Sequence, residues 1–492
     1  MRDILINVEP YEKRVAIVNR GALEEFQVER RGQERLAGNI YKAVVESIVP
    51  GIGAIFANIG TGKNGFLYMK DLEEKNFQML LEEEVVIEKR SQTKKDFLER
   101  LKKGQELIVQ VVKEPIGTKG PLITTDISMP GKYLVLMPFD NTIGISKRII
   151  DKHARARLKS DLESISIPGG MGCIARTHSA GANKRQLKLE MRYLVNLWMR
   201  IQSRASRQRA PSLVYEEYDL PLRIIRDYFD GDVSKILVDS KEEYRKISRF
   251  ANSIEPQLRK KIFFYRGKTP LFERYGVEKS IDNIFRRKVF LKSGGHIVIE
   301  KTEGLVAIDV NTGKFTGKRD PEETSFKTNM EAAETVARQT MLRDLSGIIV
   351  IDFIDMRDRR HRKALYDTLE NAFKRDKAKV NISAVSAIGL VEMTRQRVRK
   401  TLESVSFREC PYCNGLGRVK TPMTVSIEIS RKIQRPLSET RSRELAVIVH
   451  PDVAECLGAS FANVLHSLEK KYRKKISVKQ DSKLHVEDVY FE

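Results

Sequence analysis

Two apolar runs that each end in aspartate constrain the fold of this chain more than any other feature. They are residues 304–313 (GLVAIDVNTG) and residues 347–355 (GIIVIDFID), and both are rich in the β-branched residues that favour strands. Because successive side chains of a strand alternate between its faces, Asp309 and Asn311 are expected to share one face. Asp352 follows four consecutive aliphatic residues, where an ionised carboxylate is costly unless it is paired or binds a cation. The two runs therefore predict two strands that each deliver a carboxylate.

The segment between the two runs predicts a crossover helix. Residues 329–345 have Ala, Val and Leu at helical spacing, contain no Pro or Gly, and are followed by Gly347 as a stop signal. A strand, helix, strand unit brings its strand ends to one edge of the sheet, where open α/β sheets place their sites. Asp309 and Asp352 are then expected to share one divalent cation. The alternative is that each aspartate is only a turn or cap residue, which is common at strand ends.

The charge of the chain indicates a polyanionic partner. Its 89 Lys and Arg against 66 Asp and Glu give a net charge of +23, and the excess is spread along the sequence. A folded protein this basic usually meets nucleic acid, with an anionic membrane surface as the second candidate. No apolar run approaches the length of a membrane span, and residues 1–14 contain no signal-peptide core. A soluble cytoplasmic protein is therefore expected.

Residues 39–70 predict short strands separated by Gly and Pro turns, with a further strand after a charged helical insert at 71–103. Five short strands that carry aromatic residues fit a small OB-type barrel. The elements VESIVPGIGAIFANIG, KNGFL and GQELIVQVVKEPIGTKGPLIT resemble, in that order, the RNA-binding OB domain named after the first small-subunit ribosomal protein. In such a barrel Phe56 and Phe66 offer bases a stacking face and Lys119 offers phosphates a charge. The alternative is that both phenylalanines belong to the barrel core.

Residues 174–210 concentrate positive charge, with nine Arg or Lys against the single acid Glu190. A charged helix is often only a solvated face, but this excess is more than solubility needs. Arg176 and Thr177 precede a predicted helix, and a guanidinium beside a hydroxyl in that place suits a terminal phosphate. Further on, the strand at 235–239 is expected to pair with the N-terminal strands.

A third basic stretch, Arg357 to Arg362, directly follows the second aspartate run. It is expected to grip a phosphodiester that lies across the two aspartates.

Cysteine usage predicts a metal knuckle near the C-terminus. Four cysteines in 492 residues exclude a disulfide scaffold, but Cys410 and Cys413 have the two-residue spacing and following glycines of a knuckle. A tetrahedral structural zinc needs four ligands, and Cys173 and Cys456 are distant single residues, so two chains are expected to supply two thiolates each. The alternatives are a redox dithiol, for which no thioredoxin-like context is seen, and a knuckle without metal.

The order of these motifs resembles the ribonuclease E/G family over essentially the whole chain. The match consists of the OB barrel, the Arg-Thr turn, AIDVNTG, IVIDFIDM, GLVEMTRQR and CPYCNGLG. It implies a catalytic magnesium on Asp309 and Asp352, with Asn311 orienting the attacking water or the scissile phosphate. It also implies a zinc shared between subunits through Cys410 and Cys413. For RNA, it implies barrel contacts at Phe66 and Lys119, and a 5′-monophosphate pocket formed by Arg176, Thr177 and the backbone at Gly131 and Val135.

The resemblance also implies a multidomain α/β and α+β fold. An OB-fold barrel is inserted in a ribonuclease-H-like domain without that activity, and a deoxyribonuclease-I-like catalytic domain, a zinc knuckle and a small α+β domain follow. The expected ranges are 1–36 and 215–285 for the two ribonuclease-H-like parts, 37–125 for the barrel, 126–214 for the 5′-end sensor region, 286–405 for the catalytic domain, 406–420 for the knuckle and 421–492 for the last domain.

The implied activity is that of a magnesium-dependent endoribonuclease for single-stranded RNA. It would leave 5′-phosphate and 3′-hydroxyl ends, respond to a 5′-monophosphate, act in ribosomal RNA processing and messenger RNA decay, and assemble as a homodimer or homotetramer. No histidine lies within either aspartate run, which favours a metal route. The chain departs from the family at His178, where relatives carry a small residue, so the selectivity of the 5′-end pocket stays open. The alternatives are a non-catalytic RNA-binding or ribosome-assembly factor and, third, a deoxyribonuclease.

Overall fold

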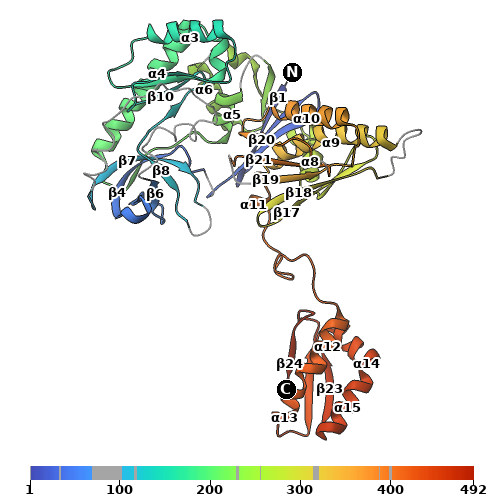
Figure 1. The fold of residues 1–492 in the computed structure, drawn as a ribbon. Coiled ribbons are helices and arrows are strands. Elements are labelled where there is room, and N and C mark those ends of the chain that lie inside the picture. Colours follow the sequence, from blue (N-terminus) through green and yellow to red (C-terminus); the bar gives the residue numbers. More distant parts are fainter. Residues whose placement is uncertain are drawn as a thin grey trace. The chain divides into compact units, whose positions relative to one another are not determined.

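The computed structural model describes residues 2–32, 35–68, 102–115, 119–228, 232–254, 256–313, 321–386, 388–397 and 402–492. They form two compact units, Met1–Glu403 and Ser404–Glu492, coloured from blue at the N-terminus to red at the C-terminus in Figure 1. The charged insert predicted at 71–103 lies outside the described residues except for its last two. Within the described part of the chain, no helix combines the length and the apolar character that crossing a membrane requires.

The first sheet of the larger unit joins the N-terminal strands to strands from much later in the sequence. Strand β1 pairs antiparallel with β2 and parallel with β14, which confirms the pairing predicted for residues 235–239. Ile4 and Ile6 pack on one face with α5 and α6, and Leu5 packs on the other with α7 and α8. The strands, in their order across the sheet, are β15 (Ile262–Phe264), β14 (Val233–Val238), β1 (Arg2–Val8), β2 (Glu12–Asn19) and β3 (Ala22–Arg30), and the helices are α5 (Leu220–Tyr228), α6 (Lys241–Ile254), α7 (Leu271–Arg274) and α8 (Val277–Ile284).

Five strands close into a barrel between the two parts of this sheet. Neighbouring strands run β4-β5-β6-β8-β7, and β7 pairs back onto β4. Aliphatic side chains such as Ile55, Leu67 and Val109 fill the interior, so the predicted five-stranded barrel is confirmed. The elements are β4 (Ile40–Val49), η1 (Pro50–Ile52), β5 (Ala54–Asn58), β6 (Gly65–Tyr68), β7 (Glu106–Lys113) and β8 (Leu122–Thr124), with β13 (Ser212–Tyr215) added to the outer edge of β4.

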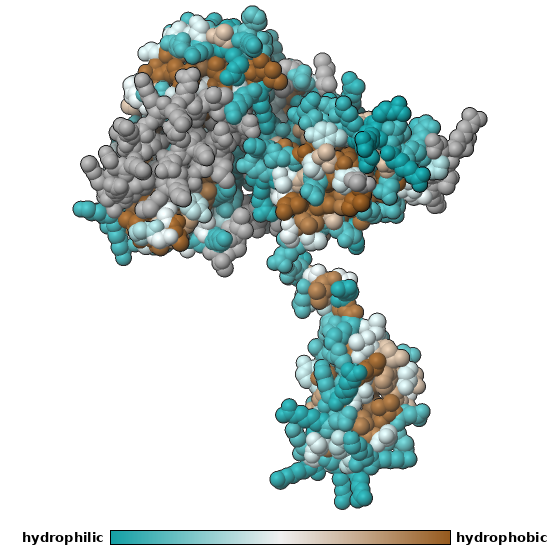
Figure 2. Space-filling view, in the orientation of Figure 1, coloured by the Kyte–Doolittle hydropathy of each residue, from teal (hydrophilic) through white to brown (hydrophobic). Residues whose placement is uncertain are grey.

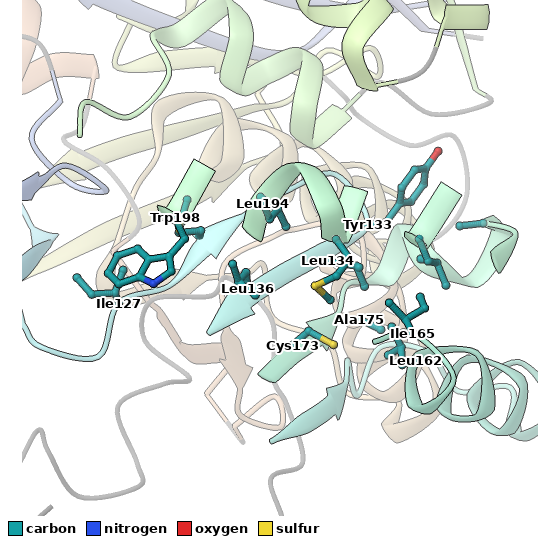
Figure 3. Packing of buried hydrophobic residues seen from close by; sticks show 14 of the residues in the cluster. Ile127, Tyr133, Leu134, Leu136, Leu162, Ile165, Cys173, Ala175, Leu194 and Trp198 are labelled. Atoms are coloured by element: carbon teal, nitrogen blue, oxygen red, sulfur yellow. The ribbon is translucent and has the colours of Figure 1, made fainter. Parts of the chain in front are cut away.

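A four-stranded sheet covered by helices follows the barrel. Figure 3 shows its core, in which Leu136 and Cys173 from the strands lie close to Leu194 and Trp198 from the long helix α4. Cys173 is fully buried in this apolar cluster and is therefore a core residue, and burial raises the pKa of its thiol to about 12. The strands, in sheet order, are β11 (Ile143–Ile145), β12 (Gly172–Ala175), β10 (Leu134–Met137) and β9 (Met129–Pro130), and the helices are α3 (Lys152–Glu163), η3 (Thr177–Gly181) and α4 (Lys184–Arg207).

The six-stranded sheet that carries the two aspartates has helices on one face. Apolar residues of α9 and α10 pack there against Ile308, Ile349 and Ile351. Helix α9 joins the parallel strands β18 and β19, which confirms the predicted crossover, although α9 begins at Pro321 and not at residue 329. The strands, in sheet order, are β16 (Lys288–Phe290), β17 (His296–Lys301), β18 (Leu305–Asn311), β19 (Gly347–Asp352), β21 (Leu390–Arg395) and β20 (Val380–Ile382), and the helices are α9 (Pro321–Arg343), α10 (Arg359–Phe373) and α11 (Leu402–Ser406).

The smaller unit contains a three-stranded sheet with helices, ordered β23-β22-β24. Strand β22 pairs parallel with β23 and antiparallel with β24, and one apolar cluster holds the unit together. The elements are α12 (Pro422–Lys432), α13 (Gln434–Glu439), β22 (Glu444–Val449), α14 (Pro451–Ser460), α15 (Ala462–Tyr472), β23 (Lys475–Gln480) and β24 (Val489–Phe491).

Candidate functional site

The two aspartates meet at the ends of parallel strands. Asp309 of β18 lies opposite Asp352 of β19 in the last pair of their ladder, and neighbouring strands are about 4.8 Å apart. The amide of Asn311 donates a hydrogen bond to the Oδ2 atom of Asp309 at 2.5 Å. Sequence periodicity predicted this convergence, and the structure brings all three side chains together on one face.

This face of the sheet is the one that helices α9 and α10 leave open. Its apolar residues Leu305 and Ile348 are 36% and 51% exposed, and Figure 2 shows hydrophobic surface over the region in which Figure 1 labels β17, β18 and β19. A long polymer can therefore reach the carboxylates without displacing any helix that the structure describes.

The structure adds a histidine that the sequence argument missed. His296 of β17 lies opposite Asn311 in the antiparallel ladder, so it shares the open face with Asp309. Burial lowers the pKa of His296, Lys288 lowers it further, and Asp309 acts in the opposite direction. The signal was available, because the register of the hairpin that delivers Asp309 places residue 296 beside residue 311.

The donor chemistry of the pair fits magnesium. Two adjacent carboxylates supply the hard oxygen ligands that Mg²⁺ prefers, and this ion usually keeps several waters or substrate oxygens besides one or two carboxylates. Among the described residues, no group of three or more His, Cys, Asp or Glu side chains is placed to hold a metal. Asp309 and Asp352 would thus hold the ion through two carboxylates and leave coordination positions open for water and phosphate.

In the basic stretch that follows Asp352, some of the N–H and guanidinium groups are already bound to carboxylates of the protein. Glu322 of α9 accepts hydrogen bonds from the backbone N–H groups of Arg357 and Asp358 at 3.0 and 3.1 Å. The guanidinium of Arg360 pairs with Asp358 at 3.0 Å. These contacts cap the start of α10, so a phosphate that binds here competes with internal carboxylates for Arg360.

Arg176 lies beside the strands of the four-stranded sheet. It follows β12, and its Nη1 atom donates to the carbonyl of Gly131 at 2.5 Å. The hydroxyl of Thr177 lies 3.3 Å from that of Ser146. Val135 pairs with Ile174 one residue before the end of β12. The structure therefore brings the four predicted pocket residues into one locality.

Glu190 shapes this pocket, a role that sequence reasoning missed. Its carboxylate accepts hydrogen bonds from the backbone N–H groups of residues 132, 133 and 134 at 2.6, 2.7 and 2.8 Å. A Cβ atom at position 131 would lie 2.7 Å from this carboxyl group, so a larger residue there would have to displace Glu190 from its three N–H donors. Burial raises the pKa of Glu190 and outweighs the three N–H donors. The single acid of the basic segment is thus a buried anchor for the loop that contacts Arg176.

Arg176 also has an internal acidic partner. Its Nη1 atom lies 2.8 Å from Oδ1 of Asp227 in α5, and Asp227 also pairs with Arg226 at 3.0 Å. Burial alone would raise the pKa of Asp227, but Arg226 and Arg176 hold it well below its ordinary value. His178 lies beside this pair, since its Nε2 atom is 3.2 Å from the backbone carbonyl oxygen of Asp227.

Three aromatic residues of the barrel, Phe56, Phe66 and Tyr68, lie outside its interior cluster. Phe56 and Phe66 pair across β5 and β6, with ring centroids 5.4 Å apart, and neither belongs to the interior cluster. Tyr68 extends the row, with its ring 4.2 Å from that of Phe66. Lys119 is exposed and precedes Leu122, which pairs with Phe66. The alternative that the two phenylalanines form the barrel core is therefore wrong, and Tyr68 is an addition to the predicted face.

The two knuckle cysteines lie in one tight turn. The backbone N–H of Gly417 donates to the Sγ atom of Cys413 at 3.2 Å, and Gly415 within the turn has a left-handed conformation (φ +82°). Backbone N–H groups of Cys413 and Tyr412 lower the pKa of the Cys410 thiol, which favours the thiolate that zinc binds. With two thiols in the turn, the donor set fits half of a tetrahedral zinc site.

Comparison with known proteins decides the family. The model of the Ribonuclease E/G family matches residues 128–398, which is more than half of the chain. Ribonuclease G of Haemophilus influenzae is 40% identical over 490 residues, which cover 97% of this chain and 96% of the relative. The chain belongs to the ribonuclease E/G family. As a member of this family it is an endoribonuclease with RNA as its substrate, so the alternative of a non-catalytic assembly factor is set aside.

Other ribonuclease E/G relatives agree with this assignment. Ribonuclease G of Escherichia coli strain K12 is 39% identical over 489 residues, 99% of this chain and 97% of the relative. Ribonuclease E of the same strain is 36% identical over 471 residues, which cover 95% of this chain but 44% of the relative. The chain is thus similar to ribonuclease G over the whole length of both proteins.

The comparison also corrects one expectation about the cysteines. A second model, described as the RNase E/G thioredoxin-like domain, matches residues 409–492. The expectation that no thioredoxin-like context surrounds Cys410 and Cys413 was therefore wrong. The sequence offered little signal, because the cysteines precede α12 in a glycine-rich turn and no strand leads directly into them. This ribonuclease E/G member is thus a multidomain α/β protein with a barrel, a catalytic region and a thioredoxin-like domain.

Proposed function

We propose that this endoribonuclease hydrolyses single-stranded RNA at Asp309 and Asp352 with magnesium, leaving 5′-phosphate and 3′-hydroxyl ends. The observation that carries the proposal is the register of β18 and β19, which pairs the two carboxylates at the open end of a parallel ladder. A binding protein gains nothing from two like charges that face a polyanion, whereas a metal-dependent nuclease needs them. In the cell, we place this activity in ribosomal RNA processing and messenger RNA decay in the cytoplasm.

Each residue of the site has a separate task. Magnesium bound there would lower the pKa of a water ligand and stabilise the charge that develops on the phosphate. Asp309 and Asp352 supply the carboxylate oxygens. Asn311 fixes the orientation of Asp309 through its 2.5 Å hydrogen bond, and the remaining polar atoms of its amide are available to the water or the scissile phosphate.

The barrel and the 5′-end pocket would hold the RNA at two points besides the aspartate pair. Phe56 and Phe66 offer stacking surfaces that accept any base, and Lys119 offers a charge to the backbone. Arg176 and Thr177 would bind the phosphate of a 5′-monophosphorylated end, with Gly131 and Val135 lining the pocket. We infer that such an end stimulates cleavage because it fixes the RNA at a second point.

Phe66→Ala is expected to weaken binding of a single-stranded RNA oligomer by about 1–3 kcal/mol, which is the usual contribution of one base-stacking aromatic residue. The measurement is fluorescence anisotropy in an Asp352→Asn background, in which the oligomer stays intact. Phe263→Ala is the matched control, because Phe263 is a half-exposed phenylalanine of β15 outside the barrel. Equal losses in both variants would show that the barrel face does not stack RNA.

Arg176→Gln is expected to remove the preference for a 5′-monophosphate without slowing cleavage of 5′-hydroxyl RNA. Two oligomers that differ only at the 5′ end are cleaved by each protein with magnesium, and the mass of the products identifies their ends. We expect wild-type kcat/KM to be about tenfold higher for the monophosphate, as a coupling of this kind typically provides. Arg185→Gln, which changes an exposed arginine in the first turn of α4, should behave like wild type. Equal rates on both oligomers for the wild type would contradict the pocket, and products with cyclic phosphates would contradict the metal route.

We further propose that Cys410 and Cys413 share one zinc ion with the same pair of a second chain, which gives a homodimer or a homotetramer. Two thiolates in one turn supply half of the four ligands that structural zinc requires. A redox dithiol is the alternative, because the same C-x-x-C spacing lowers the pKa of redox thiols. Against it, the turn does not lead directly into a helix N-terminus, since α12 begins nine residues after Cys413.

Cys410→Ser and Cys413→Ser are each expected to abolish zinc binding and to reduce the mass of the assembly. Zinc content by mass spectrometry and molar mass by light scattering measure the two effects, and wild type should hold one zinc per two chains. Cys456→Ser, at the remaining cysteine of the smaller unit, is the control and should change neither value. One zinc per chain in a monomer would exclude the shared site.

The domain identities follow the same proposal. We infer that β1–β3 with β14 and β15 form a ribonuclease-H-like domain, since three antiparallel strands are extended there by two parallel ones. We infer that residues 286–405 form a deoxyribonuclease-I-like catalytic domain. These assignments would make the first sheet a support for the catalytic one, with the barrel inserted between its two parts.

A further inference from the structure

Three regions of the larger unit meet at one lysine. Lys377 lies in the loop between α10 and β20, in the catalytic region, and its Nζ atom is 3.4 Å from the backbone carbonyl oxygen of Asp227. The same ammonium lies over the ring of Tyr228, 3.0 Å from its centroid. The carbonyl of Lys377 accepts a hydrogen bond from Arg148 at 2.9 Å. The lysine is therefore bound to the end of α5 on one side and to the sensor region on the other.

One residue, Asp227, connects Lys377 to the proposed 5′-end pocket. Asp227, whose carbonyl faces Lys377, holds Arg176 through its side chain at 2.8 Å. A phosphate with a charge of about −1.5 to −2 would compete with Asp227 for this guanidinium. Two arrangements are then available: Arg176 paired with Asp227 when the pocket is empty, and Arg176 paired with phosphate when it is occupied. In the second arrangement, Asp227 depends on Arg226 and Lys377 for compensation of its charge.

The loop that carries Lys377 is fixed to the aspartate strand by buried charges. Asp376, the neighbouring residue, pairs with Arg395 at 2.7 Å, and Arg395 pairs with Asp344 at 2.6 Å. Arg395 also donates to the carbonyl of Leu345 at 2.9 Å, in the turn that leads into β19. Strand β19 ends at Asp352 and spans about 16 Å at 3.3 Å per residue. A displacement of Lys377 therefore acts on an element that leads directly to the catalytic carboxylate.

We propose that Lys377 is a positioning residue that determines 5′-end specificity, by linking the Arg176–Asp227 pair to the strand that carries Asp352. This inference rests on the proposed response to a 5′-monophosphate, and it identifies the residue that would connect the phosphate pocket to the catalytic strand. The lysine does not bind RNA itself in this role, since its ammonium lies against a protein carbonyl and an aromatic ring. Its position instead depends on whether Arg176 pairs with Asp227 or with phosphate, and it passes that difference on to the strand that carries Asp352. Coupling between two sites of a protein typically changes binding affinity by a factor of 5 to 150, and we expect the effect on kcat to be of the same order.

The test compares Lys377→Met with wild type on the same two oligomers, carrying a 5′-monophosphate or a 5′-hydroxyl. We expect the ratio of kcat/KM values, monophosphate over hydroxyl, to fall at least about fivefold, through kcat, while the rate on the hydroxyl oligomer is unchanged. Binding of the monophosphate oligomer, measured in the Asp352→Asn background, should be retained. Lys377→Arg, which keeps a cation over the Tyr228 ring, should restore much of the ratio. Lys374→Met is the matched control, because Lys374 of the same segment makes only a local hydrogen bond, to Asn371.

Each other outcome overturns the proposal in its own way. Equal loss on both oligomers would mean that Lys377 only stabilises the fold. Weaker binding of the monophosphate oligomer at unchanged kcat would make Lys377 a direct phosphate ligand. The same change in Lys374→Met would show a general effect of charge. If the wild type shows no preference for a 5′-monophosphate, both the proposed 5′-end sensing and the role of Lys377 are contradicted. If the preference survives in Lys377→Met, only the role of Lys377 is contradicted.

Discussion

Asp309→Asn and Asp352→Asn are each expected to lower kcat/KM for RNA cleavage by a factor on the order of 10³ while leaving RNA affinity nearly unchanged. Each substitution keeps the shape of the side chain and removes one of the two negative charges that would hold magnesium. The proposed RNA-binding face of the barrel and the proposed 5′-end pocket lie on other strands of the protein, so RNA binding is not expected to depend on either carboxylate. The measurement is single-turnover cleavage of a labelled oligomer, with binding followed separately by anisotropy.

Glu300→Gln is the matched control for this experiment. Glu300 of β17 lies opposite Ala307 of β18, so its carboxylate is on the same open face of the same sheet. It is not opposite either aspartate in the ladder. Its substitution should change the rate by less than a few-fold. Cleavage at the wild-type rate by either aspartate variant would place the active site elsewhere, and an equal defect in Glu300→Gln would reduce the effect to the general charge of the face.

The proposed active-site pair was predictable because its geometry is local. Strand periodicity places Asp309 and Asn311 on one face, and a crossover helix brings Asp352 to the same edge, so two short segments contain all the information. The start of α9 was missed because its first turns are polar and give no apolar periodicity. Pro321 and the acidic residues Glu322 and Glu323 were nevertheless a helix-start signal.

For the proposed 5′-end pocket, the cationic residues were predictable from the sequence and the acidic partner was not. Arg176 and Thr177 stand together in the sequence, whereas Asp227 and Lys377 reach the pocket from 51 and 201 residues away. Such contacts depend on the packing of several domains, and no local pattern encodes them. Glu190 was visible as the only acid of its segment, but its meaning appears only when three backbone N–H groups of a distant loop point at its carboxylate.

Arg395→Met is expected to lower the free energy of local opening of β19 and β21 by about 3–5 kcal/mol, which is the usual cost of removing one partner from a buried ion pair. The side chains of Arg395 and Asp376 are 5% and 4% exposed. Burial lowers the pKa of Arg395, but Asp376 and Asp344 outweigh this and raise it, so the guanidinium stays charged. Methionine fills similar space but leaves both carboxylates without their cation.

Native-state hydrogen exchange is the appropriate measurement, because the chain has several domains and global unfolding is not a two-state process. Amides of β19 and β21 should lose protection, while those of the first sheet should not. Arg397→Met is the control, since the nearby Arg397 makes only an exposed contact with Ser346 at 3.4 Å. Unchanged protection in Arg395→Met would mean that the strand is held by its apolar face alone. In that case, the loop with Lys377 would have no firm connection to Asp352, and the proposed link between the 5′-end pocket and the catalytic strand would lose its physical basis.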